Sequence, residues 1–128
     1  MQIHHLEVQK TARIFKLGSL TEKTENIWLV LHGYGMLPEY FIQKFNQLDI
    51  EKNYIIAPEG LSKFYQNGLI GRIGASWMTS EDRENEIKDY INYLETIFQT
   101  MIQAHLSNKK LICFGFSQGV STLFRWAN

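Results

Sequence analysis

One stretch of this sequence decides its fold: Leu111-Ile-Cys-Phe-Gly115-Phe-Ser117-Gln-Gly119. Its first four residues are all apolar, which is typical of a strand buried on both faces of a parallel sheet. After Ser117 the apolar residues recur at helical spacing. Those expected on one helix face are Val120, Leu123, Phe124 and Ala127. The stretch therefore predicts a buried strand, a sharp turn at Ser117 and an amphipathic helix from Gln118 onward.

The turn has the pattern that a nucleophilic serine requires. A serine hydroxyl attacks only when a base can reach it and when nearby amides can hold the resulting oxyanion. A tight strand-to-helix turn pushes the hydroxyl of Ser117 out above the sheet, and Gly115 and Gly119 leave room for neighbouring backbone. The first amides of the helix, with the positive end of its dipole, face the developing charge.

Two further segments upstream predict parallel strands. Asn26–His32 is almost wholly apolar and runs into the turn Gly33-Tyr34-Gly35, after which Pro38 suits the first turn of a helix. Tyr54–Ala57 is a second short apolar run, closed by Pro58-Glu59-Gly60. Both patterns are those of strands inside a sheet.

The remaining segments predict a hairpin, a loop and a long helix. Residues 3–10 and 13–17 alternate roughly between polar and apolar, as the two strands of an N-terminal hairpin would. Leu61–Ser76 has no clear period and reads as a long loop. Thr79 and Asp82 resemble a capping box before a helix. Its apolar stripe is Ile87, Tyr90, Ile91, Leu94, Ile97, Phe98, Met101 and Ile102.

The alternation of strands and helices predicts one α/β domain over residues 1–128, with a mainly parallel sheet flanked by helices. The composition is 45% apolar and 20% charged with no net charge, which favours a globular chain without a nucleic-acid partner. The single Cys113, in an apolar run, is expected to be a small buried residue. No signal peptide and no run of about 18 apolar residues occurs, so we expect a cytoplasmic protein without a membrane span.

Four motifs together resemble the phospholipase/carboxylesterase family, the acyl-protein-thioesterase-like branch of the α/β-hydrolases. They are Leu31-His32-Gly33-Tyr34-Gly35, Ala57-Pro58-Glu59-Gly60, Ala75-Ser76-Trp77 and Gly115-Phe116-Ser117-Gln118-Gly119. The resemblance implies that Ser117 is the nucleophile and that the amides of Tyr34 and Gln118 form the oxyanion hole. It also implies a small ester or thioester substrate, and no cofactor. The substrates it allows are carboxylic esters, thioesters or lysophospholipids.

Two residues of these motifs keep alternative roles. Trp77 would lie near the acyl site by the resemblance, or it is a core or lid aromatic. His32 is a poor candidate for the catalytic base, because that histidine normally follows the last strand of the fold. We expect His32 to have a structural role in packing its turn. No pair of histidines has the spacing of a helical metal site, and we expect no metal.

The resemblance stops before the triad is complete. In this fold the acid and the histidine follow the nucleophile, yet Gln118–Asn128 contains no Asp, Glu or His. The chain provides about five strands, up to the nucleophile turn and its helix, of an eight-stranded sheet. We therefore expect a truncated gene product, a fragment of a gene model or an expressed piece. Without a later neighbour the strand 111–114 becomes an apolar edge, which favours self-association.

Two other functions compete with an esterase. A dinucleotide-binding domain would begin with a similar strand and Gly33-x-Gly35 turn, but Pro38 stands where the third glycine belongs. The missing glycine argues against that function. The stronger rival is a catalytically inactive hydrolase fragment, or a module that only binds.

Overall fold

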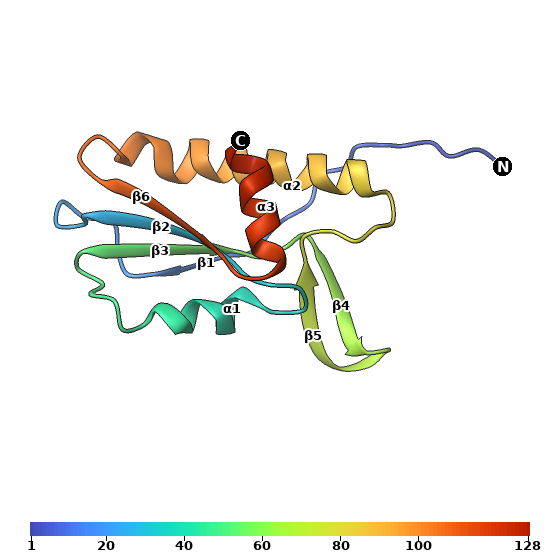
Figure 1. Cartoon of the computed structure of the whole chain (residues 1–128), viewed down its shortest axis with the longest axis horizontal. Coiled ribbons are helices and arrows are strands. Elements are labelled where there is room, and N and C mark those ends of the chain that lie inside the picture. Colours follow the sequence, from blue (N-terminus) through green and yellow to red (C-terminus); the bar gives the residue numbers. More distant parts are fainter.

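A four-stranded sheet runs through the centre of the molecule, as the computed structural model of residues 1–128 describes it (Figure 1). The strands lie in the order β1-β3-β2-β6. β2 pairs in parallel with both β3 and β6, and β1 runs antiparallel along the edge of β3. Their bounds are Ile14–Leu17 for β1, Asn26–Leu31 for β2, Asn53–Pro58 for β3 and Lys110–Gly115 for β6. The expected α/β class with a mainly parallel sheet is confirmed.

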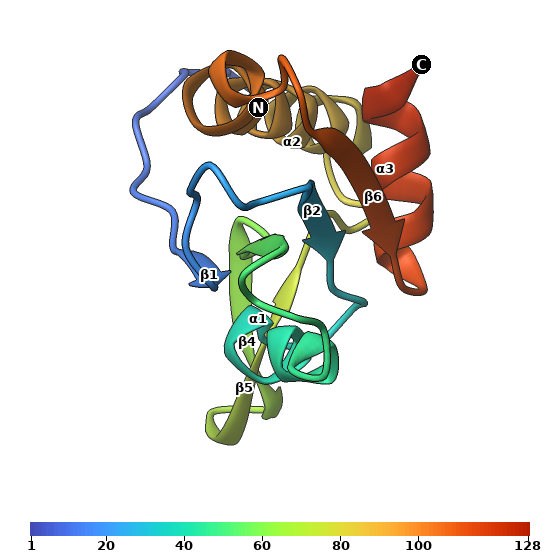
Figure 2. The same ribbon diagram turned by 90° about the vertical axis from the view of Figure 1, so that its left-hand side faces the viewer.

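Helices cover both faces of this sheet (Figure 2). α1 (Pro38–Phe41), with Pro38 in its first turn as expected, continues as a 3-10 turn at Ile42–Phe45 and lies on one face. α2 and α3 lie on the other face. α2 spans Arg83–Ile97 and continues through a π-helical turn at Phe98–Ile102 and a 3-10 turn at Gln103–His105, and α3 spans Gln118–Ala127. None of these helices is long and apolar enough to cross a bilayer.

The core has one layer on each side of β2 and β3. Alternate residues of these strands face opposite ways, so Leu29 and Ile56 pack toward α2, whereas Val30 and Ile55 pack toward α1. All four side chains are completely buried. Burial on both faces explains why these segments are continuous apolar runs in the sequence.

The expected N-terminal hairpin is wrong. Residues 3–10 form no strand, and Ile3, Leu6 and Val8 remain largely exposed. β1 instead pairs with β3, with Phe15 opposite Ala57. The open edge of a central strand is a better partner than a short polar segment, because it lets Phe15 and its neighbours pack on the core. The main sheet therefore has four strands, not about five.

The expected loop Leu61–Ser76 is also wrong, because it folds as a two-stranded hairpin. β4 (Ser62–Asn67) pairs antiparallel with β5 (Ile70–Ser76), and the hairpin projects away from the main sheet (Figure 1). Gly68, with φ of 78°, is the first central residue of the turn, where a type II′ turn requires glycine. Gly68 was the signal that could have predicted this turn, because glycine at the first central position is typical of a type II′ hairpin. Most of β4 and β5 is exposed, so burial imposed no clear period on the sequence.

α2 begins differently from the expected capping box. The residue before its first turn is Asp82, which adopts a left-handed conformation and makes no side-chain cap. Thr79 instead bonds Glu86, whose carboxylate accepts from both the amide and the hydroxyl of Thr79. A capping pair seven residues apart leaves no signature at the usual three-residue spacing.

β6 is an edge strand, as its sequence context predicted, and this leaves the neighbouring surface open. Cys113 is exposed, so the expectation that it is buried is wrong. On α3 the structure buries Gly119 and Thr122, whereas Val120 and Phe124 of the expected apolar face are 40% and 61% exposed. No element of the chain covers these two side chains fully.

Candidate active site

Ser117 occupies a strained turn between β6 and α3. Its φ of 54° and ψ of −116° lie outside the regions that L-residues prefer. A non-glycine residue held in such a conformation costs on the order of 1–3 kcal/mol and is found mostly at functional sites. The side chain is exposed at the carboxyl end of the parallel strands. This is the geometry by which a strand-to-helix turn presents a reactive serine.

Two glycines make the turn sterically possible. A Cβ atom on Gly119 would lie 2.2 Å from the carbonyl oxygen of Leu31. A Cβ atom on Gly115 would lie 2.5 Å from the carbonyl oxygen of Gly119. No side chain fits at either distance, so the start of α3 can approach the end of β2 only where both positions are glycine.

The turn at Ser117 and the turn after β2 lie side by side. Leu31 is the register partner of Gly115, so β2 and β6 end at the same level of the sheet. The amide of Phe116 donates to the carbonyl of Leu31 at 3.0 Å, and a Cβ on Gly33 would lie 3.1 Å from the carbonyl of Phe116. Segments more than 80 residues apart in the sequence therefore meet at one edge of the sheet.

Two backbone amides at this edge have no partner in the secondary structure. The amide of Tyr34 lies in the turn after β2 and makes no hydrogen bond with the backbone, although those of Gly35 and Met36 do. Gln118 is the first residue of α3, where an amide has no acceptor within the helix. The ring of Tyr34 is 58% exposed and stacks on Phe64 of β4. These are the two amides that the sequence assigned to an oxyanion hole.

The side chain of Gln118 has a second role that the sequence did not reveal. Its Oε1 accepts from the amide of Trp77 at 2.9 Å, and its Nε2 donates to the carbonyl of Met78 at 2.8 Å. Ser76 also lies within hydrogen-bond distance of the same amide group. Gln118 thus ties the start of α3 to the segment that follows β5, and so fixes the turn at Ser117 from the other side.

Trp77 is a core residue. It is 1% exposed, its indole nitrogen donates to the carbonyl of His32 at 2.8 Å, and its ring stacks on the His32 imidazole. This placement agrees with the core alternative for Trp77 and not with an open acyl pocket. Its effect on the site is indirect, through His32 and through Gln118.

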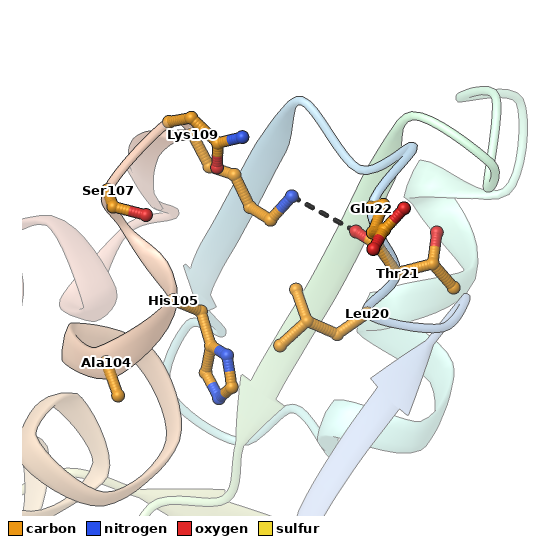
Figure 3. A pocket seen from close by; sticks show the side chains of 8 residues that line it. Leu20, Thr21, Glu22, Ala104, His105, Ser107 and Lys109 are labelled. Carbon is orange, nitrogen blue, oxygen red and sulfur yellow. Dashed lines mark hydrogen bonds between the residues drawn. The ribbon is translucent and has the colours of Figure 1, made fainter.

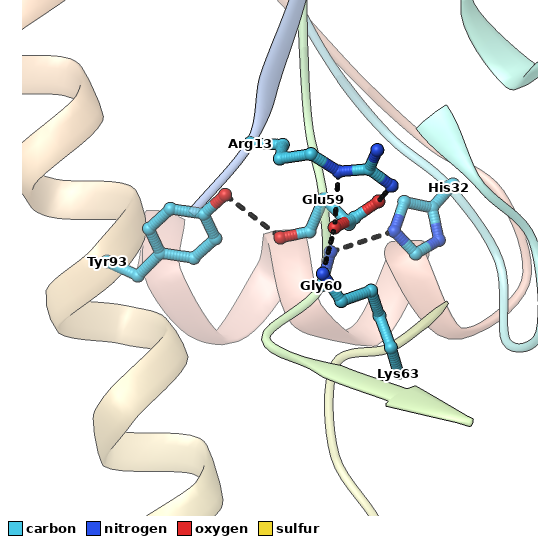
Figure 4. Close-up of polar contacts among 6 residues, drawn as sticks. All are labelled: Arg13, His32, Glu59, Gly60, Lys63 and Tyr93. Carbon is cyan, nitrogen blue, oxygen red and sulfur yellow. Dashed lines mark hydrogen bonds and ion pairs between the residues drawn. The ribbon is translucent and has the colours of Figure 1, made fainter. Parts of the chain in front are cut away.

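His32 is completely buried and both of its ring nitrogens have partners. The amide of Gly60 donates to Nε2 at 2.9 Å (Figure 4). Nδ1 lies 2.8 Å from the carbonyl of Gly33. Burial lowers the pKa of the imidazole below its ordinary value. Because neither nitrogen is free to take a proton from Ser117, His32 has the structural position that the sequence predicted.

A buried carboxylate, Glu59, lies next to this histidine at the end of β3 (Figure 4). Arg13 binds it through two hydrogen bonds of 3.1 and 2.6 Å, and the ammonium of Lys63 lies 3.4 Å away. Burial opposes ionisation of Glu59, but the two cations outweigh it and hold its pKa below the usual range. The carbonyl of Glu59 accepts from the hydroxyl of Tyr93, whose pKa is raised by burial and by this carboxylate.

Acid should weaken the fold through His32 and Glu59. The pKa of each is lowered by folding, so each contributes stability above its unfolded pKa, about 6.5 and about 4.5, and loses that contribution as the pH falls through the folded pKa. Urea denaturation at pH 7.5 and pH 5 should therefore give a smaller free energy of unfolding at pH 5. His32→Asn, which cannot titrate, should flatten the dependence between these values. An unchanged dependence in that variant would show that His32 does not cause it.

No imidazole of the chain is hydrogen-bonded to Ser117. The Ser117 side chain makes no capping hydrogen bond, and the ring of His32 is occupied as described. His5 lies on the N-terminal segment and contacts Asp82, and His105 follows α2. No three potential ligands gather into a group that could hold a metal ion. None of these imidazoles is therefore hydrogen-bonded to the Ser117 hydroxyl.

A separate hollow lies at the opposite end of the sheet (Figure 3). It opens between the loop before β2 and the turn before β6, whose first residues Asn26 and Lys110 are register partners. Its one lysine, Lys109, already donates to the carbonyls of Thr21 and Thr24. The hollow therefore lies at the other end of the strands from Ser117, and its lysine is already held by two backbone carbonyls.

The chain has a mainly parallel sheet with helices on both faces, and a strained serine turn joins one strand to the helix that follows it. These features define an α/β-hydrolase fold. The chain belongs to the phospholipase/carboxylesterase family, whose model matches residues 13–123. Among solved structures it is similar to acyl-protein thioesterase 2 of Zea mays, with 19% identity and a TM-score of 0.63 over 91% of this chain. The chain covers 51% of that protein, about half its length. No curated protein matches it significantly by sequence.

Proposed function

We propose that this chain is the nucleophile-bearing part of a serine esterase or thioesterase that forms an acyl-enzyme on Ser117. The observation that carries the proposal is the positive φ of Ser117 at the joint of β6 and α3. Membership of a hydrolase family supports the same chemistry. The expected substrate is a small carboxylic ester, thioester or lysophospholipid.

The proposed reaction has two steps. The Ser117 oxygen attacks the substrate carbonyl while a base removes its proton, and the tetrahedral oxyanion accepts from the amides of Tyr34 and Gln118. The tetrahedral intermediate then collapses and expels the alcohol or thiol, which takes the proton from the base. The acyl group stays on Ser117. Water then attacks the acyl-enzyme with the same base, releasing the acid and the free serine. We propose that the imidazole and its carboxylate lie on polypeptide outside these 128 residues.

The experiment that tests this proposal extends the reading frame past Asn128. An in-frame continuation carrying an aspartate and then a Gly-His pair would provide a base and its acid. The longer protein should hydrolyse p-nitrophenyl esters or acyl thioesters, and Ser117→Ala should abolish that turnover. Equal turnover in the variant would overturn the proposed nucleophile.

An inactive fragment or binding module is the alternative function. The lack of any histidine at the Ser117 hydroxyl favours it for the isolated chain. A reading frame that supplies no histidine base would support this alternative over the enzyme. The cytoplasmic location, and the absence of a cofactor and of a nucleic-acid partner, stay predictions from the sequence.

We also propose that the isolated chain self-associates through the β6 edge. Phe114, Phe116 and Phe124 are 41–61% exposed there, which leaves about 300 Å² of aromatic surface open on each copy at roughly 200 Å² per ring. Two copies would bury about 600 Å² of the roughly 1,600 Å² of a standard interface, and the unpaired strand edge would supply further contact. Sedimentation should show a concentration-dependent dimer that Phe124→Lys weakens. Leu69→Lys, at the exposed tip of the β4–β5 hairpin, is the control and should leave the dimer unchanged.

A further inference from the structure

We infer that His32 is a positioning residue that aims the Tyr34 amide toward the Ser117 site. This inference rests on the proposed function, which gives the Tyr34 amide its role. The carbonyl of Gly33 and the amide N–H of Tyr34 belong to one peptide unit. Because that unit is planar and trans, its C=O and N–H point in opposite directions. A group that fixes the carbonyl therefore fixes the direction of the amide.

The hydrogen bonds of His32 define which nitrogen carries its proton. The amide of Gly60 can only donate, so Nε2 must accept and has no proton. In the neutral ring the proton then lies on Nδ1, which donates to the carbonyl of Gly33 at 2.8 Å. The burial-lowered pKa agrees with a neutral ring. One imidazole thus accepts a hydrogen bond from the turn after β3 and donates one that orients the turn after β2.

The ring itself has little freedom to move. Its centroid lies 5.0 Å from that of Trp77 with an interplanar angle of 27°, and both side chains are buried. The indole of Trp77 holds the carbonyl of His32, and the amide of Trp77 is held by the Gln118 side chain. The residues that provide the two proposed oxyanion donors are therefore connected through Trp77 and His32.

A second donor also reaches the Gly33 carbonyl and offers another way to orient this peptide without His32. The amide of Met36 donates to Gly33 at 3.2 Å, which closes the turn by itself. If that bond were sufficient, the histidine would only fill space. The shorter contact from Nδ1 is the one that a substitution can remove without altering the backbone.

Two variants separate the functions of the two nitrogens. The amide of an asparagine lies near the position of Nδ1, so His32→Asn keeps a donor to Gly33 and loses the acceptor for Gly60. The amide of a glutamine reaches the position of Nε2, so His32→Gln keeps the acceptor and loses the donor. The measurement is the ¹H–¹⁵N spectrum of the 128-residue chain, in which the Tyr34 and Gly60 amides are followed separately.

We expect His32→Gln to displace the Tyr34 resonance and His32→Asn to leave it near its original position while moving that of Gly60. Equal displacement of Tyr34 in both variants, displacement in neither, or displacement in His32→Asn alone would overturn the inference. If His32→Gln fails to fold, the imidazole ¹⁵N shifts of the unmodified chain decide, since a proton on Nε2 contradicts it. None of these readouts needs catalysis, so a failure of ester turnover would sink the proposed function without mimicking any of these results.

Discussion

Purified residues 1–128 should hydrolyse p-nitrophenyl esters no faster than the Ser117→Ala variant does. The physical reason is that no imidazole is hydrogen-bonded to the serine: the buried His32 uses both of its nitrogens, and His5 pairs with Asp82. Removing the histidine of a catalytic triad costs on the order of 10⁶ in kcat. Initial rates measured over background hydrolysis check this prediction.

A matched variant guards this result against contamination by a host esterase. Ser121→Ala alters an exposed hydroxyl four residues along the same segment and should also give the background rate. Turnover that is lost in Ser117→Ala but kept in Ser121→Ala would mean that a base within this chain reaches the nucleophile. In that case the description of the site as incomplete is wrong.

The second large effect is expected from Gly119→Ala, which should destabilise the chain by about 3 kcal/mol or more. Alanine normally favours a helix over glycine by about 1 kcal/mol, so propensity alone predicts a gain. Against this, the added Cβ would lie 2.2 Å from the Leu31 carbonyl and 2.8 Å from that of His32. Overpacking of a side chain typically costs 1–3 kcal/mol, and here the atoms met are backbone and cannot move aside. Urea denaturation followed by tryptophan fluorescence measures the change.

The control for this substitution lies in the same helix. Ser121→Ala is exposed and should change the free energy of unfolding by less than about 0.5 kcal/mol. A Gly119→Ala protein as stable as the original would mean that α3 does not pack against the end of β2. The close approach of the two turns, and the proposed oxyanion hole with it, would then be wrong.

The central strands could be predicted from the sequence because burial on both faces leaves a strong pattern. β2 and β3 are apolar runs buried on both faces, whereas the apolar run of β6 lies at the edge of the sheet. The glycines around Ser117 mark where backbone meets backbone. The segments whose structure was predicted wrongly lie at the surface. The β4–β5 hairpin is mostly exposed, and residues 3–10 alternate by chance without a sheet to join. A local pattern cannot say whether an open strand edge exists elsewhere for a segment to pair with.

The site could be predicted only where it consists of backbone turns. The turn at Ser117 and the turn containing Tyr34 are each a contiguous motif with fixed spacing, so their residues can be recognised from the sequence alone. The supporting contacts join residues far apart in the chain: the Gln118 side chain reaches Trp77, and Arg13 reaches Glu59 across 46 positions. Glu59 is an acidic residue at the end of an apolar strand, and nothing local reveals that Arg13 neutralises it there.

The central claim is that Ser117 is the nucleophile of an α/β-hydrolase site, and covalent labelling tests it most directly. The longer protein, which continues past Asn128 and contains a histidine base, is treated with a fluorophosphonate, digested and mapped by mass spectrometry. The predicted result is one phosphonyl adduct on the peptide that contains Ser117, absent from Ser117→Ala. An adduct on another serine that survives in Ser117→Ala, together with unchanged ester turnover, would contradict the claim.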